Sequence, residues 1–209
     1  MKLPSHFYAI VDTSAGHDPL ALAQTMLDAG VRIMQLRLKN AATRDFVAAA
    51  RGISKLCRGR GAIFIVNDRV DIAMLSEADG VHLGQTDLPL NEARKLLGPK
   101  KIIGVSTSSV AMARDAESGG ADYIGFGPMY PGGLKNNARG QGLENLQAVR
   151  ATVRLPIVAI GGITEATLPE VLAAGADAAA IITDVVNAPD VAAKIKSILS
   201  LKSLMPFMQ

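Results

Sequence analysis

Short apolar runs rich in isoleucine and valine recur along this chain, and each is followed by a longer segment whose apolar residues have helical spacing. The eight runs are Phe7–Val11, Arg32–Leu36, Ala62–Val66, Gly80–Leu83, Ile102–Val105, Tyr123–Phe126, Pro156–Ile160 and Ala178–Ile182. The eight helical segments are Pro19–Ala29, Thr43–Arg58, Val70–Ser76, Leu90–Leu97, Ser109–Gly119, Leu143–Val153, Ala166–Ala174 and Val191–Leu199. Runs that are apolar on both faces and alternate with helices indicate parallel strands joined by crossover helices.

Eight strand–helix units in 209 residues fit a small (β/α)8 TIM barrel. A doubly wound open sheet is the alternative, but such a sheet usually stops at five or six strands. We therefore predict an α/β fold with one TIM-barrel domain over residues 1–209, of which 201–209 form an apolar C-terminal tail. Thr43 and either Thr164 or Glu165 are the expected N-caps of the second and seventh helices.

The composition is that of an ordinary globular protein, with 49% apolar and 20% charged residues, and it excludes a disordered chain. The single cysteine, Cys57, excludes a disulfide scaffold, and a free thiol fits a reducing compartment. The apolar runs are far shorter than the roughly 18 residues of a membrane span. The first residues lack the apolar stretch of a signal peptide. We expect a cytoplasmic protein with no membrane partner.

The formal net charge of +3 does not identify a partner by itself. A nucleic-acid surface would need clustered basic residues, often with stacking aromatics, whereas here the basic residues are scattered and aromatics are 4% of the chain. We expect no nucleic-acid partner. A mildly basic surface is compatible with small anionic substrates. The oligomeric state stays open, and a homo-oligomer formed through the C-terminal tail is less favoured than packing of that tail on the barrel.

Three polar residues follow one another at alternate positions at the end of the second run. Because Gln35, Arg37 and Lys39 alternate, they share one face of an extended segment. Polar side chains that point into a barrel are costly unless they bind something. Arginine offers a planar fork for phosphate, and lysine a mobile point charge. The alternative is that Arg37 and Lys39 only pair with carboxylates across the barrel mouth.

Two carboxylates follow neighbouring runs. Asp68 comes directly after the third run, and Asp87 follows the fourth run by a few residues. Active sites of TIM barrels lie at the carboxyl ends of the strands, so both aspartates belong to the expected working face. Oxygen ligands that face basic side chains suggest Mg²⁺ together with a polyphosphate. The alternatives are a helix N-cap for Asp68 and a turn or cap before Pro89 for Asp87.

A second phosphate-binding region is expected after the later strands. Ser106 ends the fifth run, in a group of hydroxyls of which one can bind phosphate and another caps the next helix. The loop 127–142 carries Lys135 and is the expected lid. Gly161-Gly162 after the seventh run and Ile182-Thr183 after the eighth stand where backbone amides bind phosphate in such barrels.

Other catalytic constellations are missing from the sequence. There is no Ser/His/Asp triad, no zinc-ligand spacing, and Cys57 falls inside a helical segment. His82 lies within the fourth run, and we interpret it as a packed residue or one that supports a ligand-binding neighbour.

Several segments in this order resemble the thiamine phosphate synthase family over nearly the whole chain. The segments are Gln35-Leu36-Arg37-Leu38-Lys39, Val66-Asn67-Asp68-Arg69-Val70-Asp71-Ile72-Ala73, Ala78-Asp79-Gly80-Val81-His82-Leu83-Gly84-Gln85-Thr86-Asp87, Ile103-Gly104-Val105-Ser106, Ala121-Asp122-Tyr123-Ile124-Gly125-Phe126-Gly127-Pro128 and Ile160-Gly161-Gly162-Ile163. The resemblance implies Mg²⁺-dependent transfer of an aminopyrimidine methyl group from its diphosphate ester to the nitrogen of a thiazole phosphate, with release of pyrophosphate through a dissociative, carbocation-like step.

The resemblance also assigns residues by position. It implies that the pyrimidine diphosphate is held by Gln35, Arg37, Lys39 and Asn67, that Mg²⁺ is bound by Asp68 and Asp87, and that pyrophosphate is contacted by Ser106 and Lys135. It implies a thiazole phosphate site at Gly132, Gly133, Leu134, Gly162, Ile182 and Thr183. Arg37, Lys39, Ser106 and Lys135 would be the catalytic side chains, because this chemistry needs stabilisation of leaving-group charge rather than a nucleophile.

The chain departs from the family pattern in the loop after the sixth run. The family usually has Thr-x-Thr-Lys where this sequence has Gly132-Gly133-Leu134-Lys135. The diphosphate half of the site is therefore intact and the thiazole half is altered. The alternatives are a relative with a different acceptor, a non-catalytic relative, and a thiazole tautomerase. Retention of Asp68 and Asp87 argues against the tautomerase.

Overall fold

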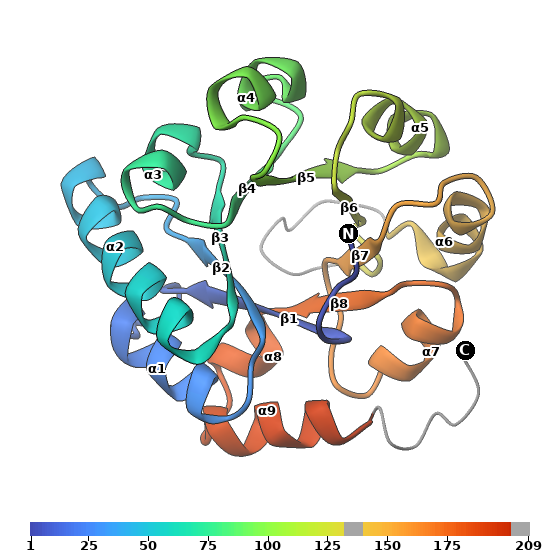
Figure 1. Ribbon diagram of the computed structural model, residues 1–209. Coiled ribbons are helices and arrows are strands. Elements are labelled where there is room, and N and C mark those ends of the chain that lie inside the picture. The colour runs from blue at the N-terminus through green and yellow to red at the C-terminus, as the bar shows by residue number, and fades with distance from the viewer. Residues whose placement is uncertain (132–139, 202–209) are drawn as a thin grey trace.

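The computed structural model describes residues 1–131 and 140–201, in which eight parallel strands close into one barrel inside a layer of helices (Figure 1). The strands are ordered around the barrel as in the chain, and β8 pairs with β1, with Tyr8 opposite Ala180. The predicted TIM barrel is confirmed, and the doubly wound open sheet is wrong. Within these two segments, none of the helices has the length and apolar character needed to cross a membrane.

Each predicted run overlaps one strand of the barrel. The strands are β1 (Phe7–Asp12), β2 (Ile33–Arg37), β3 (Ile63–Asn67), β4 (Gly80–Leu83), β5 (Ile102–Thr107), β6 (Tyr123–Phe126), β7 (Ile157–Ile160) and β8 (Ala178–Ile181). The helices are α1 (Pro19–Asp28), α2 (Thr43–Arg60), α3 (Val70–Leu75), α4 (Leu90–Leu97), α5 (Val110–Ser118), α6 (Gly142–Arg150), α7 (Leu168–Ala173), α8 (Thr183–Val186) and α9 (Val191–Ser200).

Alternation along the strands divides the buried residues between two cores. The outward-facing residues pack with the helices in one large cluster, which includes Val11, Leu36 and Ile53. The inward-facing residues form a second cluster inside the barrel, which includes Tyr8, Ile65, Tyr123, Val158, and partly buried Leu3 from the segment before β1. Leu3 therefore helps to fill the barrel at its amino end, and polar side chains collect at the carboxyl end.

An aspartate directly precedes each of β4, β6 and β8 and ties the amino ends of neighbouring strands together. The side chains of Asp79, Asp122 and Asp177 accept hydrogen bonds of 2.8 Å from the backbone N–H groups of Phe64, Ile103 and Ile157, which lie on the preceding strands β3, β5 and β7. Arg94 from α4 also pairs with Asp122 at 2.6 Å. These contacts satisfy strand-end donors that have no sheet partner.

The structure corrects the sequence analysis at three places. The short helix α8 was not predicted, because a four-residue helix is too short to show apolar periodicity. Thr43 is the first residue of α2, and its N-cap is Ala42, which makes no side-chain capping bond. Helix α7 begins at Leu168 with Thr167 as N-cap, because Thr164 and Thr167 bond to each other in a preceding turn.

Candidate active site

The expected site residues lie at or just beyond the carboxyl ends of the strands. Gln35 and Arg37 are on β2, Asn67 ends β3, and Ser106 is on β5. Lys39, Asp68, Asp87 and Gly162 follow β2, β3, β4 and β7, and Ile182 and Thr183 follow β8. Gly132, Gly133, Leu134 and Lys135 lie outside the described residues. The structure thus brings the predicted diphosphate residues, Lys135 excepted, to neighbouring strand ends.

Asp12 holds Arg37 in place. Asp12 ends β1 opposite Arg37 of β2, and its carboxylate lies 2.5 Å from the guanidinium while its other oxygen accepts from the Ser14 N–H at 2.9 Å. Burial opposes ionisation of Asp12, but the bonds from Ser14 and Arg37 outweigh it and lower its pKa. Sequence reasoning missed Asp12, although its alternation with Tyr8 and Ile10 places it on the inner face.

The two aspartates that follow β3 and β4 form an acidic pair with one lysine beside it. Burial, and then contact with the Asp87 carboxylate, raise the pKa of Asp68, and Lys39 partly offsets this effect. The Lys39 ammonium lies 3.6 Å from Asp68. Arg37 and Lys39 therefore both form the ion pairs with carboxylates that the sequence offered as an alternative to ligand binding. Lys39 does not fully offset the repulsion between Asp68 and Asp87, because the pKa of Asp68 is still raised.

Asp68 has an unusual backbone, with a φ of +64° in the left-handed region. Such a conformation costs free energy in a non-glycine residue and often marks a functional position. The capping role considered for Asp68 is wrong, because the N-cap of α3 is Arg69 and no side chain caps the helix. The turn considered for Asp87 is present, since its carboxylate accepts from the Gly84 N–H at 2.6 Å.

Asn67 presents an unpaired amide to the same region. The residue is 8% exposed, and its carboxamide makes no hydrogen bond within residues 1–131 and 140–201. Because the amide is not among the fully buried polar atoms that lack a partner, it reaches the solvent at the mouth and is free to contact a ligand there. Asn67 lies opposite His82 of β4, which places the amide beside the acidic pair.

The hydroxyl of Ser106 contacts a histidine that is buried inside the barrel. The His82 Nε2 lies 2.9 Å from the Ser106 Oγ, and the His82 Nδ1 lies 2.9 Å from the Tyr123 hydroxyl. Burial lowers the pKa of His82 to about 4, with Asp87 acting in the opposite direction, so the imidazole is neutral at pH 7. The interpretation of His82 as a residue that supports a neighbour agrees with these contacts.

On the other side of the mouth, the loop after β6 lies against the glycines that follow β7. The Met129 N–H donates to the Ile160 and Gly161 carbonyls at 2.9 and 3.1 Å. Gly161 and Gly162 have φ values of +86° and +71°, and a Cβ at Gly162 would lie 2.8 Å from the Tyr130 Cβ. Glycine is needed here for both conformation and space. This packing positions the start of loop 127–142 over strand β7.

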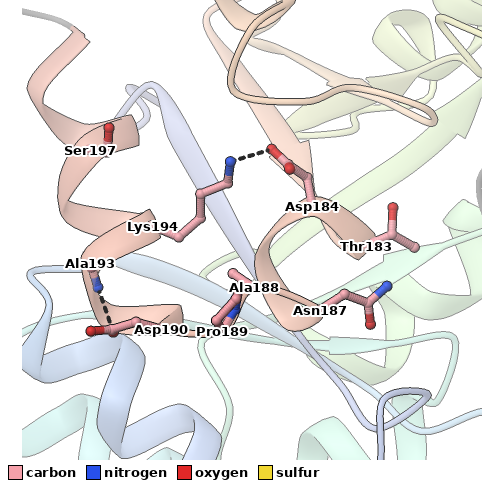
Figure 2. Close-up of a pocket in the computed structure, with 9 residues that line it drawn as sticks. All are labelled: Thr183, Asp184, Asn187, Ala188, Pro189, Asp190, Ala193, Lys194 and Ser197. Atoms are coloured by element: carbon pink, nitrogen blue, oxygen red, sulfur yellow. Dashed lines mark hydrogen bonds and ion pairs between the residues drawn. The ribbon is translucent and has the colours of Figure 1, made fainter.

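Helix α8 begins directly after β8 and borders a cavity of about 530 Å³ shared with α9 (Figure 2). Lys194 of α9 reaches Asp184 at 3.1 Å and Glu165 at 2.9 Å, and it crosses one side of this cavity. Thr183 lies on the rim, and its hydroxyl makes no hydrogen bond to the described residues. Lys194 is paired with two carboxylates, whereas Thr183 and Asn187 line the cavity with side chains that have no hydrogen-bond partner among the described residues.

The carboxyl end of the barrel is chemically divided between its two sides. Strands β1 to β5 supply cationic side chains, an acidic pair, an unpaired amide and a hydroxyl, whereas β6 to β8 supply glycines, backbone amides and one threonine. This arrangement defines a (β/α)8-barrel enzyme whose charged and polar side chains gather at the carboxyl ends of the strands, where active sites of such barrels lie. In the parts of the chain that the structure describes, no cluster of three or more His, Cys, Asp or Glu side chains occurs that could hold a metal ion.

The chain belongs to the thiamine monophosphate synthase family, whose model matches residues 7–185. A relative from Moorella thermoacetica, named thiamine-phosphate synthase, is 48% identical over 189 residues, which cover 89% of this chain and 90% of the relative. A relative of the same name from Methanoculleus marisnigri is 44% identical over 194 residues, with 91% and 92% covered.

Solved structures agree with this family. The thiamine phosphate pyrophosphorylase from Pyrococcus furiosus is 36% identical, with a TM-score of 0.88 and 95% of each chain covered. A 3-hexulose-6-phosphate synthase has a TM-score of 0.73 at 21% identity, and it supports the barrel fold alone.

Proposed function

We propose that this protein joins an aminopyrimidine methyl group, supplied as its diphosphate ester, to the nitrogen of a thiazole phosphate, and so forms thiamine phosphate and pyrophosphate. The observation that carries the proposal is the gathering of Arg37, Lys39, Asn67, Ser106 and the acidic pair at neighbouring strand ends. Membership of the family and the names of its relatives support the same reaction. We further propose that the enzyme is cytoplasmic, as its free, buried cysteine suggests.

In this proposal the diphosphate binds over β2 to β5. Gln35 and Asn67 offer amides that can recognise the ring nitrogens and amino group of the pyrimidine. Arg37, held by Asp12, presents a fixed guanidinium fork, and Lys39 presents a point charge beside Asp68. Ser106 contributes a hydroxyl to the diphosphate, and Lys135 is proposed to do so from the loop outside the described residues.

Asp68 and Asp87 fit the ligand set of Mg²⁺. Two carboxylates close enough for one to raise the pKa of the other repel each other, and a divalent cation between them removes that repulsion. Mg²⁺ is commonly held by one or two carboxylates, with water and substrate phosphates completing its shell. When bound, Mg²⁺ would supply charge neutralisation for the leaving diphosphate.

The chain's own residues then stabilise a separation of charge. The bond between the pyrimidine methylene carbon and the diphosphate oxygen breaks, and its electron pair leaves with the diphosphate. Arg37, Lys39 and Ser106 stabilise the negative charge that develops on that oxygen. The thiazole nitrogen donates its lone pair to the methylene carbon and forms the new bond. Water must be excluded from the mouth, because it would trap the cation as an alcohol.

The thiazole phosphate is proposed to bind on the other side of the mouth. Gly162, Ile182 and Thr183 follow β7 and β8, where backbone amides commonly bind phosphate in such barrels, and the Thr183 hydroxyl has no partner among the described residues. Gly132, Gly133 and Leu134 would complete the site through their backbone. Restoring threonine at 132 and 134 should lower the KM for thiazole phosphate, and an unchanged KM would mean that other groups already replace those hydroxyls.

Purified protein supplied with the pyrimidine diphosphate, thiazole phosphate and Mg²⁺ should form thiamine phosphate and pyrophosphate in equal amounts. Absence of both products would contradict the proposal and favour a non-catalytic relative. Pyrophosphate without thiamine phosphate would favour a different acceptor. Isomerisation of the thiazole without pyrophosphate release would favour the tautomerase, against which the acidic pair and the relatives' names already argue.

A further inference from the structure

Five polar side chains form a continuous hydrogen-bonded chain through the interior of the barrel. Gln35 Nε2 lies 3.2 Å from the Tyr8 hydroxyl, which lies 2.9 Å from the Tyr123 hydroxyl. Tyr123 lies 2.9 Å from His82 Nδ1, and His82 Nε2 lies 2.9 Å from Ser106 Oγ. The chain crosses the barrel from β2 to β5 and connects two residues that the proposed function places on the same substrate.

Two glycines leave the space that the hydrogen-bonded side chains of Tyr123 and His82 occupy. A Cβ at Gly104 would lie 2.1 Å from Tyr123 Cζ, and a Cβ at Gly125 would lie 2.9 Å from His82 Cε1. Both glycines lie inside strands, where a glycine weakens the strand because it adds flexibility and no packing. The centroid of the Tyr123 ring lies 5.9 Å from that of Tyr8 and 5.5 Å from that of His82, and the ring planes are tilted by 41° and 32°, so Tyr123 contacts both of the other rings.

Counting protons shows in which direction the five side chains donate their hydrogen bonds. The Gln35 amide nitrogen can only donate, so the Tyr8 oxygen accepts from it. Burial raises the pKa of Tyr8 to about 12 and also raises the pKa of Tyr123 well above its ordinary value, so both phenols keep their single proton. Within residues 1–131 and 140–201 the Tyr8 hydroxyl has one other hydrogen-bond partner, the Tyr123 hydroxyl, and therefore donates to it. Tyr123 therefore donates to the remaining neighbour, the Nδ1 of His82.

The same count fixes the proton of the imidazole. Because Nδ1 accepts from Tyr123, the neutral ring carries its proton on Nε2 and donates it to the Ser106 oxygen. The Ser106 hydroxyl then keeps its own proton for another acceptor, and no other side chain or backbone group in residues 1–131 and 140–201 bonds to that hydroxyl. Ser106 is partly exposed, so the acceptor must come from the mouth.

We propose that His82 is a positioning residue which, with Tyr8 and Tyr123, fixes Ser106 as a hydrogen-bond donor to the diphosphate and couples it to Gln35 through one directional chain. The kinetic part of this inference rests on the proposed function. A serine left to rotate could turn its proton toward the protein, whereas a serine that already accepts from His82 points its proton at an anion. Preorganised donors of this kind are what stabilises charge in a leaving group.

The imidazole proton can be located without any substrate. In ¹⁵N-labelled protein at pH 7, long-range ¹H–¹⁵N correlations should show His82 with a pyridine-type Nδ1 and a pyrrole-type Nε2. The chain has three histidines, so loss of one signal set in His82→Gln assigns it. A protonated Nδ1 would overturn the proposal. It would mean that the Gln35 amide is turned so that its oxygen accepts from Tyr8, which reverses the donor and acceptor in every bond of the series. Ser106 would then donate its proton to His82 instead of to a ligand in the mouth.

Kinetics then test the coupling. His82→Leu removes the donor to Ser106 and should lower kcat/KM for the pyrimidine diphosphate at least tenfold, while the KM for thiazole phosphate changes little. His82→Gln places an amide N–H near the position of Nε2 and should recover most of the loss. Tyr123→Phe keeps the ring and removes only the hydroxyl, so it should lower kcat/KM severalfold even if His82→Leu folds poorly.

His6→Gln is the matched control. His6 is equally buried and bonds through Nε2 to the Ile198 carbonyl at 3.0 Å, but it precedes β1 at the amino end of the barrel. Its kcat/KM should stay within about twofold of the wild type. Equal losses in His6→Gln and Tyr123→Phe would overturn the positioning role and leave a general effect on stability. If the reaction is absent but the tautomer is as stated, the proposed function fails and the hydrogen-bond chain stands.

Discussion

Asp12 controls the position of the guanidinium at the barrel mouth. It is 2% exposed and lies 2.5 Å from Arg37, which has no other side-chain partner among the described residues. Without this carboxylate, the arginine would lose its fixed direction and would also be left near the apolar interior without its counter-charge. Catalytic electrostatics depend on such supporting contacts as much as on the residues that touch the ligand.

Asp12→Asn should therefore raise the KM for the diphosphate and destabilise the fold by about 3 kcal/mol, because it leaves a largely buried arginine unpaired. The pKa of Asp12 is lowered in the folded state, so its contribution is complete above the ordinary aspartate pKa and is lost as pH falls through the folded pKa. Denaturation in urea at several pH values should show the difference between wild type and variant shrinking under acid conditions. Asp28→Asn, which breaks an exposed pair with Arg60, is the control and should change nothing.

The pKa of Asp68 is shifted in the opposite direction to that of Asp12, so its effect on stability depends on pH in the opposite way. Its folded pKa is raised, so in the metal-free protein its favourable contribution is present at low pH and is lost as pH rises through that pKa. Asp68→Asn removes the repulsion with Asp87, and asparagine tolerates the left-handed backbone. Without metal, the variant should melt at a higher temperature than the wild type at pH 7. A lower melting temperature would show that the carboxylate stabilises the empty site.

At the scale of elements, the glycines after β7 fix the loop that follows β6. Gly162→Ala places a methyl group 2.8 Å from the Tyr130 Cβ and in a left-handed conformation. We expect a rise of several-fold in the KM for thiazole phosphate, with little change for the pyrimidine diphosphate. Gly16→Ala is the control, since its φ of +81° carries the same backbone strain and nothing lies within 4 Å of the added Cβ. Equal kinetics in the two variants would contradict a role for this packing.

The aspartates before β4, β6 and β8 join neighbouring strands at the amino end. Asp122→Ala should lower the free energy of unfolding by about 2 kcal/mol, because it leaves the Ile103 N–H and the Arg94 guanidinium without this partner. Urea unfolding measures the loss, and kcat should change little because the site lies at the other end of the barrel. Asp115→Ala on the exposed face of α5 controls for removal of a negative charge. An equal loss in both variants would exclude the specific contact.

The elements themselves were predictable to the extent that they are long or strongly apolar. The strands are visible in the sequence as short apolar runs such as Ala62–Val66, and of the eight runs only Arg32–Leu36 includes a charged residue, at its start. Helix α8 has four residues, and no periodic pattern can be recognised over so short a segment. The caps at Thr43 and Thr164 were misplaced, because threonine in a sequence indicates a helix start only to within a few residues.

At the scale of the whole molecule, closure of the barrel brings together residues that are distant in sequence. The alternation of Gln35, Arg37 and Lys39 and the positions of Asp68 and Asp87 after their strands were enough to predict one shared mouth. The partners inside the barrel were not predictable in this way. Whether Tyr8 meets Tyr123, or Asp12 meets Arg37, depends on strand register and ring packing, which a sequence pattern does not specify.

The proposed division of the mouth into a diphosphate side and a thiazole phosphate side rests most heavily on the acidic pair. Thiamine phosphate formation, measured against Mg²⁺ concentration in the wild type, Asp68→Asn and Asp87→Asn, tests this claim directly. We predict saturable Mg²⁺ dependence in the wild type, and in each variant a fall of at least a hundredfold in kcat/KM at the same Mg²⁺ concentration. Unchanged Mg²⁺ dependence in either variant would contradict the account.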